Sequence, residues 1–275
     1  STVRYTREDG LNTNNIISLY ADSSGKLLLG TIKGPTVFAN GRFSSVTSFP
    51  ETIVRQIHKA GSLLYVATPD KIFRLNPGDL SILDSISLEL KNHYIKRFYI
   101  ISDRQMLIGT TNGLFLWSAG KLDKIPGLGN VAIWGLRQVN NVIYAMTEKG
   151  VYSVDAANRS ATPRFAMPKG ITTSVNDIVY LPDRNVYWVG SWGNGILEYK
   201  DNRFVKRYDY QSGFSGQYVH RFLQTGKMDI WMATYGSGII YRRKSPLAFI
   251  ALQNNPDLSK HMHFTRTINN DYLVW

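Results

Sequence analysis

A short sequence motif recurs along the chain: a small polar residue, a loop with glycine, and then an apolar residue. We call this motif the repeated phrase. Two aromatic residues occupy matching places in its longest copies. SWGNGI at 191–196 contains Trp192, and TYGSGI at 234–239 contains Tyr235. An aromatic ring presents a large flat apolar face, on which a sugar ring can stack. Trp192 and Tyr235 are therefore candidates for binding a carbohydrate. The alternative is that each ring seals the gap between two neighbouring structural units.

Arginines recur at one position upstream of these phrases. The small residues that precede the phrases are taken as anchors, and the residues twelve places before them are Ser18, Arg55, Arg97, Ile133, Ile178 and Arg221. Guanidinium groups hold carboxylates and sulfates through two parallel hydrogen bonds. Arg55, Arg97 and Arg221 are therefore candidates for binding an anion, unless they pair with carboxylates or backbone carbonyls of neighbouring units.

Histidines offer little further chemistry. The five histidines are His58, His93, His220, His261 and His263. His220 directly precedes Arg221 and is a further candidate for ligand binding, whereas His261 and His263 lack a nearby carboxylate and make a poor metal site. The sequence contains no G-x-S-x-G motif, no P-loop and no acidic cluster with metal-ligand spacing. It therefore predicts no catalytic residue, no metal site and no cofactor.

The composition favours an anionic partner that is not a nucleic acid. Lys and Arg number 32 against 20 Asp and Glu, which gives a formal charge of +12. A positive surface attracts anions, although salt screens exposed charges beyond about 8–10 Å. The alternative is a basic, well-solvated surface with no specific anionic partner. The densest basic run, RRK at 242–244, is too short for a nucleic-acid-binding arm. Cysteine is absent. No apolar run is long enough to span a membrane, so we expect no membrane contact by these residues.

The repeated phrase indicates a repeated structural unit. Its anchors follow one another at steps of 37, 42, 36, 45 and 43 residues and are Gly30, Ala67, Gly109, Ala145, Gly190 and Ala233. Repeats of this length, with short apolar strands and turn signals such as Asn40-Gly41, are typical of four-stranded propeller blades. We therefore predict an all-β fold, a β-propeller of four-stranded antiparallel blades. The alternative is a β-sandwich, which does not require an equal repeat length.

We expect a single propeller domain over residues 1–275, with six complete blades and a partial seventh. The complete blades are predicted at 14–48, 51–88, 93–125, 130–167, 173–210 and 217–253. The partial blade is predicted at 260–275, with residues 3–6 as a closing strand. Because the seventh blade stops inside its second strand, the chain is expected to be the front portion of a longer polypeptide.

This architecture positions the candidate residues. Strands alternate in direction, so the repeated phrases form loops between the second and third strands and share one rim with the connectors between blades. Glycines in the phrases permit turns that a side chain would obstruct, and a small anchor lets one sheet pack closely on the next. Loops on a rigid framework are where binding residues usually lie. Trp192 and Tyr235 should therefore lie on that rim, and the arginines near a central channel.

A second phrase recurs before the first strand of several blades. Its copies are DGLNTNNI at 9–16, KGITTSV at 169–175, SGFSGQYV at 212–219 and, more weakly, PGLGNV at 126–131. With these connectors, YTREDGLNTNNIISLYADSSGKLLLGT at 5–31 and VYWVGSWGNGI at 186–196 resemble the two-component regulator propeller repeat. The resemblance covers nearly the whole chain. The second and fourth blades depart from it, with alanine at the anchor and poor connectors.

The resemblance implies the periplasmic sensor domain of a hybrid two-component system. Proteins of that family join such propellers through a β-sandwich and one membrane span to a histidine kinase, and they sense oligosaccharides. The whole protein would then be anchored in the inner membrane and regulate polysaccharide-utilisation genes, while these residues would have no enzymatic activity. The implied partners are an oligosaccharide, a downstream propeller or β-sandwich of the same polypeptide, and a second copy in a homodimer.

The ligand and two other functions stay open at this point. The charge of +12 favours an acidic glycan, such as a sulfated or uronic-acid oligosaccharide. One alternative is a propeller lyase or hydrolase for a small substrate, in which His220 would act with a glutamate and a divalent ion. The glutamates in comparable loops are Glu8, Glu89 and Glu148. The other alternative is a scaffold that binds protein through its rim.

Overall fold

The computed structural model describes residues 5–88, 93–225, 229–242, 249–252, 264–266 and 272–274. The chain divides into two compact units. The first unit is Val3–Ile133, and the second unit is Trp134–Trp275 together with Ser1–Thr2. Each unit is described by itself below.

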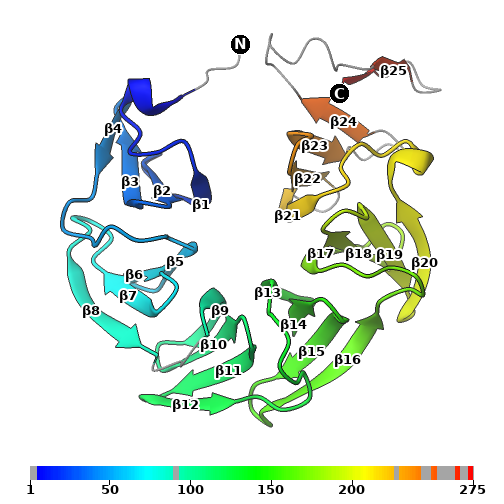
Figure 1. Cartoon of the computed structure of the whole chain (residues 1–275), viewed down its shortest axis with the longest axis horizontal. Coiled ribbons are helices and arrows are strands. Elements are labelled where there is room, and N and C mark those ends of the chain that lie inside the picture. The colour runs from blue at the N-terminus through cyan, green and yellow to red at the C-terminus, as the bar shows by residue number, and fades with distance from the viewer. Residues whose placement is uncertain are drawn as a thin grey trace. The chain divides into compact units, whose positions relative to one another are not determined.

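The described part of the first unit forms three antiparallel sheets of four strands each (Figure 1). Each sheet follows chain order, so that strands adjacent in sequence pair in space. Blade 1 consists of β1 (Ile16–Ala21), β2 (Leu27–Thr31), β3 (Gly34–Ala39) and β4 (Arg42–Ser45). Blade 2 consists of β5 (Gln56–Ala60), β6 (Leu63–Ala67), β7 (Lys71–Leu75) and β8 (Ile82–Ser87). Blade 3 consists of β9 (Ile95–Ser102), β10 (Gln105–Thr110), β11 (Gly113–Ser118) and β12 (Lys121–Lys124).

The second unit repeats this pattern in three four-stranded sheets of its described residues. Blade 4 consists of β13 (Gly135–Val139), β14 (Val142–Thr147), β15 (Gly150–Asp155) and β16 (Ser160–Ala166). Blade 5 consists of β17 (Val175–Leu181), β18 (Val186–Ser191), β19 (Ile196–Lys200) and β20 (Arg203–Tyr208). Blade 6 consists of β21 (Val219–Thr225), β22 (Asp229–Thr234), β23 (Ile239–Arg242) and β24 (Phe249–Leu252).

These sheets confirm the all-β prediction and its six propeller blades of four antiparallel strands, counted over the described residues. The partial seventh blade is not shown. Of its predicted span, the structure describes β25 (Phe264–Arg266) and β26 (Tyr272–Val274), which pair with each other, and the remainder lies outside the described residues. Residues 3 and 4 of the predicted closing strand also lie outside them, whereas Thr6 caps a short helix.

Two short 3-10 helices explain the second repeated phrase. η1 (Arg7–Asp9) precedes blade 1 and η2 (Tyr210–Ser212) precedes blade 6. Each ends at a glycine of the phrase in the left-handed region, with φ of 103° at Gly10 and 81° at Gly213. Such a φ favours glycine because a β-carbon would clash with the backbone. Neither described helix is long and apolar enough to cross a membrane.

The hydrophobic core lies between successive sheets of each unit. In the first unit, Tyr65 of blade 2 and Phe98 of blade 3 belong to one buried cluster. In the second unit, Trp188 of blade 5 and Phe222 of blade 6 belong to another. Burying one such side chain stabilises the fold by about 1.5–3 kcal/mol, so the sheet faces account for most of the driving force for folding.

The small anchors allow this close packing, as predicted. A β-carbon at Gly109 would lie 2.6 Å from the side chain of Ile133, and one at Gly190 would lie 2.7 Å from Val219. Ile133 precedes the first strand of the next blade, and Val219 is the first residue of that strand in blade 6. A methyl group would therefore force neighbouring backbones apart, which is the physical reason for the repeated small residue.

The fourth anchor is Met146 rather than the predicted Ala145. Met146 pairs with Gly135 across β13 and β14, and its backbone carbonyl accepts a hydrogen bond from Trp134. A β-carbon at Gly135 would lie 2.5 Å from the Met146 side chain. The large and small partners are thus exchanged in blade 4. For this reason the position of a small residue does not indicate the strand register of blade 4.

A Thr or Ser hydroxyl closes the loop that follows each anchor. In every described blade, this hydroxyl donates to a backbone carbonyl three or four residues further along, at 2.7–3.1 Å. The donors are Thr31, Thr68, Thr110, Thr147, Ser191 and Thr234. The loops after Ser191 and Thr234 span four residues and the others three. The repeated Thr or Ser therefore has a structural cause.

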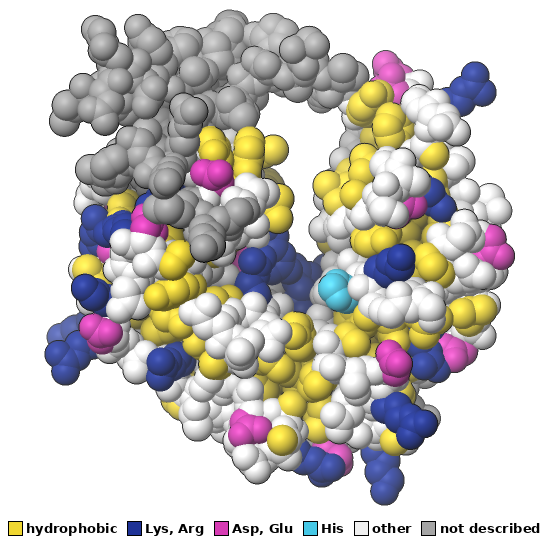
Figure 2. Space-filling view, turned by 180° about the vertical axis from the view of Figure 1, so that it is seen from behind, with side chains coloured by type: hydrophobic (Ala, Val, Ile, Leu, Met, Phe, Trp, Pro, Cys, Tyr) yellow, Lys and Arg dark blue, Asp and Glu magenta, His cyan; other side chains and the backbone are white. Residues whose placement is uncertain are grey.

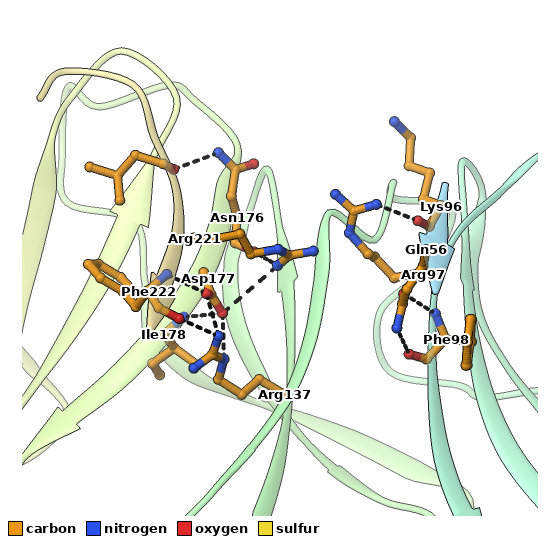
Figure 3. A network of polar contacts seen from close by, with 11 residues as sticks. Gln56, Lys96, Arg97, Phe98, Arg137, Asn176, Asp177, Ile178, Arg221 and Phe222 are labelled. Atoms are coloured by element: carbon orange, nitrogen blue, oxygen red, sulfur yellow. Dashed lines mark hydrogen bonds and ion pairs between the residues drawn. The ribbon is translucent and has the colours of Figure 1, made fainter. Parts of the chain in front are cut away.

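Asp177 joins all three blades of the second unit (Figure 3). It lies on β17 of blade 5, and its side chain is 0% exposed. Arg137 of blade 4 contacts both carboxylate oxygens at 2.7 Å, and the backbone N–H of Phe222 in blade 6 donates to Oδ2 at 2.8 Å. Arg137 also donates to the Phe222 carbonyl at 2.8 Å. A buried charge needs such partners, so these contacts hold the three innermost strands together.

We predict that the hydroxyl of Thr110 stabilises its loop. It donates to the Gly113 carbonyl and accepts from the Asn112 N–H, both at 3.0 Å. Thr110→Val should lower the free energy of unfolding by about 1–3 kcal/mol because both backbone groups lose their partner, while Thr110→Ser should stay close to wild type. Urea denaturation measures the free energy of unfolding of both variants. Thr47→Val, at an exposed site, is the control. Equal stability of Thr110→Val and Thr110→Ser would contradict this role.

We also predict that Asp177 is among the most sensitive positions of the second unit. Asp177→Ala removes the carboxylate that pairs with Arg137 and that accepts from the Phe222 N–H, and should lower the free energy of unfolding by about 3–5 kcal/mol. Asp84→Ala is the matched control, because Asp84 pairs with Arg74 on the surface with 48% of its side chain exposed. That exposed pair should contribute about 0–1 kcal/mol. Similar losses for the two variants in chemical denaturation would refute the prediction.

Candidate ligand-binding site

Four aromatic side chains gather in the second unit at the junction of blades 5 and 6. The ring centroid of Trp192 lies 5.1 Å from Tyr218, 5.3 Å from His220 and 5.6 Å from Tyr235. Tyr218 and Tyr235 lie 6.1 Å apart. We call these four residues the aromatic cluster. The structure thus brings together three of the predicted site residues, Trp192, His220 and Tyr235, and adds Tyr218.

Backbone hydrogen bonds fix the loops that carry the cluster. Trp192 directly follows β18 and donates its N–H to the Ser174 carbonyl at 2.9 Å, while the Thr173 hydroxyl donates to the Trp192 carbonyl. Tyr235 follows β22 and donates its N–H to the Tyr218 carbonyl at 2.9 Å. Trp192 and Tyr218 also form an isolated antiparallel bridge. The rings are therefore presented by cross-linked loops.

The cluster both seals the junction and faces solvent. Its rings contact each other across blades 5 and 6, as the sealing alternative expects. Yet Trp192 is 39% exposed, Tyr218 37% and Tyr235 65%. Large apolar surface left exposed on ordered loops offers a stacking surface for a ligand, and the phenol and imidazole groups add hydrogen-bonding capacity at its edge.

Tyr218 was not singled out by the sequence. It lies in the connector SGFSGQYV, whose repetition drew attention to its glycines and its apolar residues. The signal that could have found it is positional. A connector and the preceding loop between second and third strands meet on one rim, so an aromatic residue at the end of a connector lies next to one in that loop.

Arg221 directly follows His220 of the aromatic cluster and lies on β21, the innermost strand of blade 6. It pairs with the anchor Ala233, as its spacing predicted. Its guanidinium donates to the Asn176 carbonyl of blade 5 at 3.1 Å and lies 3.9 Å from the Asp177 carboxylate (Figure 3). The side chain remains 37% exposed. Its role in ligand binding stays a prediction.

Arg55 and Arg97 lie in the first unit. Arg97 of blade 3 pairs with the anchor Gly109, and its guanidinium donates to the Arg55 carbonyl of blade 2 at 3.4 Å and to the Lys96 carbonyl at 2.7 Å. Arg55 is one residue short of the equivalent position, because Gln56 pairs with the anchor Ala67. Both arginines stay predictions as ligand-binding residues.

The twelve-residue count therefore needs correction in three blades. The residues opposite the anchors are Ser18, Gln56, Arg97, Gly135, Asp177 and Arg221. Gln56, Gly135 and Asp177 replace Arg55, Ile133 and Ile178. The count fails because hairpins between first and second strands differ in length, so a fixed spacing does not preserve register.

The described residues contain no group of three or more His, Asp or Glu side chains arranged to hold a metal ion. The predicted absence of a metal and of a cofactor stays a prediction. His220 lies edge-on to the Trp192 ring in the aromatic cluster. The role of His220 in ligand binding stays a prediction.

Many solved structures resemble this one, among them the following three. The extracellular domain of the putative one component system BT4673 from B. thetaiotaomicron gives a TM-score of 0.72 at 18% identity, over 96% of this chain and 38% of that one. The extracellular domain of the putative hybrid two component system BT3049 from the same organism gives 0.71 at 18% identity, over 99% and 40%. The WD40 β-propeller domain of Doa1 gives 0.64 at 12% identity, over 83% and 78%.

These comparisons establish the fold. No family model matches the sequence, and no curated protein matches it. This chain spans 38% and 40% of the two B. thetaiotaomicron domains. The chain therefore has a β-propeller fold of the kind found in extracellular domains of one- and two-component systems, in agreement with the resemblance of its repeats.

Proposed function

We propose that this chain is a ligand-sensing propeller of a hybrid two-component system and that it recognises an oligosaccharide. The fold shared with the extracellular domains of BT4673 and BT3049 supports this assignment. In this proposal the domain lies in the periplasm, and the whole protein is anchored in the inner membrane and regulates polysaccharide-utilisation genes. Its partners are a downstream propeller or β-sandwich of the same polypeptide and a second copy in a homodimer.

The aromatic cluster is the observation that carries the ligand class. Trp192, Tyr218 and Tyr235 are exposed on loops held by backbone hydrogen bonds, so their faces are preorganised. A sugar ring has an apolar face that stacks on such rings and a rim of hydroxyl groups that reach polar neighbours. Stacking on a rigid surface requires little loss of conformational entropy, which favours binding.

The charge supports an acidic glycan. The chain carries a formal charge of +12, and on the face in Figure 2 Lys and Arg side chains protrude at many separate points. Dispersed positive charge draws an anionic ligand over a Debye length of about 8 Å at physiological salt. In this proposal Arg221 contributes a nearby guanidinium, and sulfate or uronic-acid groups give the ligand its negative charge.

The proposal assigns no catalysis to these residues. Two of the compared structures are extracellular domains of regulatory systems and the third is a WD40 propeller, and none is described as an enzyme. A lyase or hydrolase would release products from an oligosaccharide on incubation with the chain. Turnover that disappears on chelation or in His220→Ala would replace the sensor assignment with an enzymatic one.

We predict that the aromatic cluster determines glycan affinity. In calorimetry against acidic and neutral oligosaccharides, Trp192→Ala and Tyr235→Ala should each weaken binding about tenfold or more, since buried aromatic anchors commonly contribute 2 kcal/mol or more. Phe204→Ala is the matched control, because Phe204 is 40% exposed on β20 of the same unit against 39% for Trp192. It should bind like wild type.

The same titrations at two salt concentrations test the acidic preference. Affinity for an acidic glycan should fall as salt rises, because exposed charges are screened. Binding of a neutral glycan that is insensitive to salt would reject the acidic preference and keep the sensor. Unchanged affinity in both cluster variants would reject the aromatic cluster as the site.

A further inference from the structure

A polar cavity of about 170 Å³ lies next to the aromatic cluster in the second unit. Its lining residues are Gly193, Asn194, Arg207, Asp209, Tyr210, Gln211 and Gln217. Two walls are shared with the cluster, because Gly193 follows Trp192 and Gln217 precedes Tyr218. The backbone N–H groups of Gly193 and Gly195 donate to the Gln217 carbonyl at 3.0 and 2.8 Å, which joins the two walls.

A capped turn contributes part of the lining of this cavity. Asp209 is 8% exposed, and its carboxylate accepts from the Ser212 N–H at 3.2 Å, while its own N–H donates to the Ser212 hydroxyl at 2.7 Å. Phe214, which is fully buried, donates its N–H to the Asp209 carbonyl at 2.8 Å. These contacts fix η2, which carries Tyr210 and Gln211. The polar side chains therefore extend from an ordered framework.

The charges inside the cavity balance. Nε of Arg207 lies 2.6 Å from Oδ2 of Asp209, and Nη1 of Arg207 donates to Oδ1 of Asn194 at 3.3 Å. The ion pair leaves the cavity without net charge. A sulfate or carboxylate entering it would compete with the Asp209 carboxylate for Arg207. The cavity is therefore suited to an uncharged group.

The remaining lining groups are matched to hydroxyls. The side-chain amides of Asn194, Gln211 and Gln217 and the Tyr210 phenol can each donate and accept hydrogen bonds. A sugar hydroxyl does the same, whereas a sulfate or carboxylate only accepts and an ammonium group only donates. The volume of the cavity limits the size of the ligand group that can enter it. Sites that enclose a whole small ligand measure about 300–1,000 Å³, so 170 Å³ suits one ring of a larger ligand.

We propose that this cavity is a subsite for one uncharged sugar residue, adjacent to the residue that stacks on the aromatic cluster. This inference rests on the proposed function and adds a second position to it. The acidic groups of the ligand then lie outside the cavity, where the dispersed basic side chains are. The ligand is an oligosaccharide of mixed character, with a neutral residue beside a stacked one.

Nuclear magnetic resonance of the full chain tests the subsite directly. Uncharged monosaccharides (glucose, galactose, mannose and xylose) are titrated while the side-chain amide signals of Asn194, Gln211 and Gln217 and the indole signal of Trp192 are followed. At least one sugar should shift the three amide signals saturably, with the same affinity at low and high salt. Glucuronate should shift them less, because the cavity already contains the Asp209 carboxylate.

Variants then link the cavity to oligosaccharide binding. Gln217→Leu and Gln211→Ala should each weaken oligosaccharide binding about five- to tenfold, as expected for loss of a hydrogen bond. Gln211 is exposed, so its truncation should leave the fold intact. Gln105→Ala, at an exposed glutamine of β10 in the first unit, is the matched control and should bind like wild type.

The outcomes separate this inference from the function on which it rests. An oligosaccharide that shifts the Trp192 indole but none of the three amides, with wild-type affinity in both glutamine variants, overturns the subsite and keeps the proposed function. Amide shifts that are stronger for glucuronate and weaken with salt overturn the neutral preference. If no monosaccharide or oligosaccharide shifts either set of signals, both proposals fail.

Discussion

The buried carboxylate of Asp177 is the constraint on which the second unit depends. A charge with no exposure is tolerated when neighbours supply opposite charge and N–H donors, and Arg137 and Phe222 supply both from the two adjacent blades. These contacts fix β21 of blade 6 against β17 of blade 5. They therefore determine where Tyr218 and His220 lie relative to Trp192. The ion pair on the innermost strands and the backbone hydrogen bonds between the loops together position the aromatic cluster.

The loops that carry the cluster are variations on one closure. In each described blade a Thr or Ser hydroxyl binds a carbonyl of the following turn, and this leaves the next residue free to vary. That residue is Ile32, Pro69, Thr111, Glu148, Trp192 and Tyr235 in chain order. In blades 5 and 6 this residue is aromatic, and the loop is one residue longer than in the other blades. A common framework thus supports a local surface that differs from blade to blade.

Positive charge has two separate uses in this molecule. Arg97 and Arg221 donate to backbone carbonyls of the neighbouring blade within their own units, so these guanidinium groups connect sheets. The basic side chains that protrude at many points in Figure 2 act over longer distances, where their effect depends on salt. Arg207 is paired with Asp209 and leaves its cavity neutral. Net charge can attract a ligand, but the partners of each arginine decide which group is bound.

Much of the fold was predictable because each blade repeats its own local signals. The repeat length, the small anchors and the turn residues act within one blade, so the sequence by itself determined the six four-stranded antiparallel sheets of the described chain. It also singled out Trp192, His220 and Tyr235. The strand register was not predictable from these signals. Hairpins vary in length, and in blade 4 the large residue Met146 stands at the anchor with the small residue Gly135 opposite it. The tertiary structure therefore decided that Asp177 lies opposite an anchor, that Tyr218 completes the cluster, and that Arg207 is neutralised by Asp209. These features depend on contacts between blades or between distant turns, which no spacing within a single repeat can reveal.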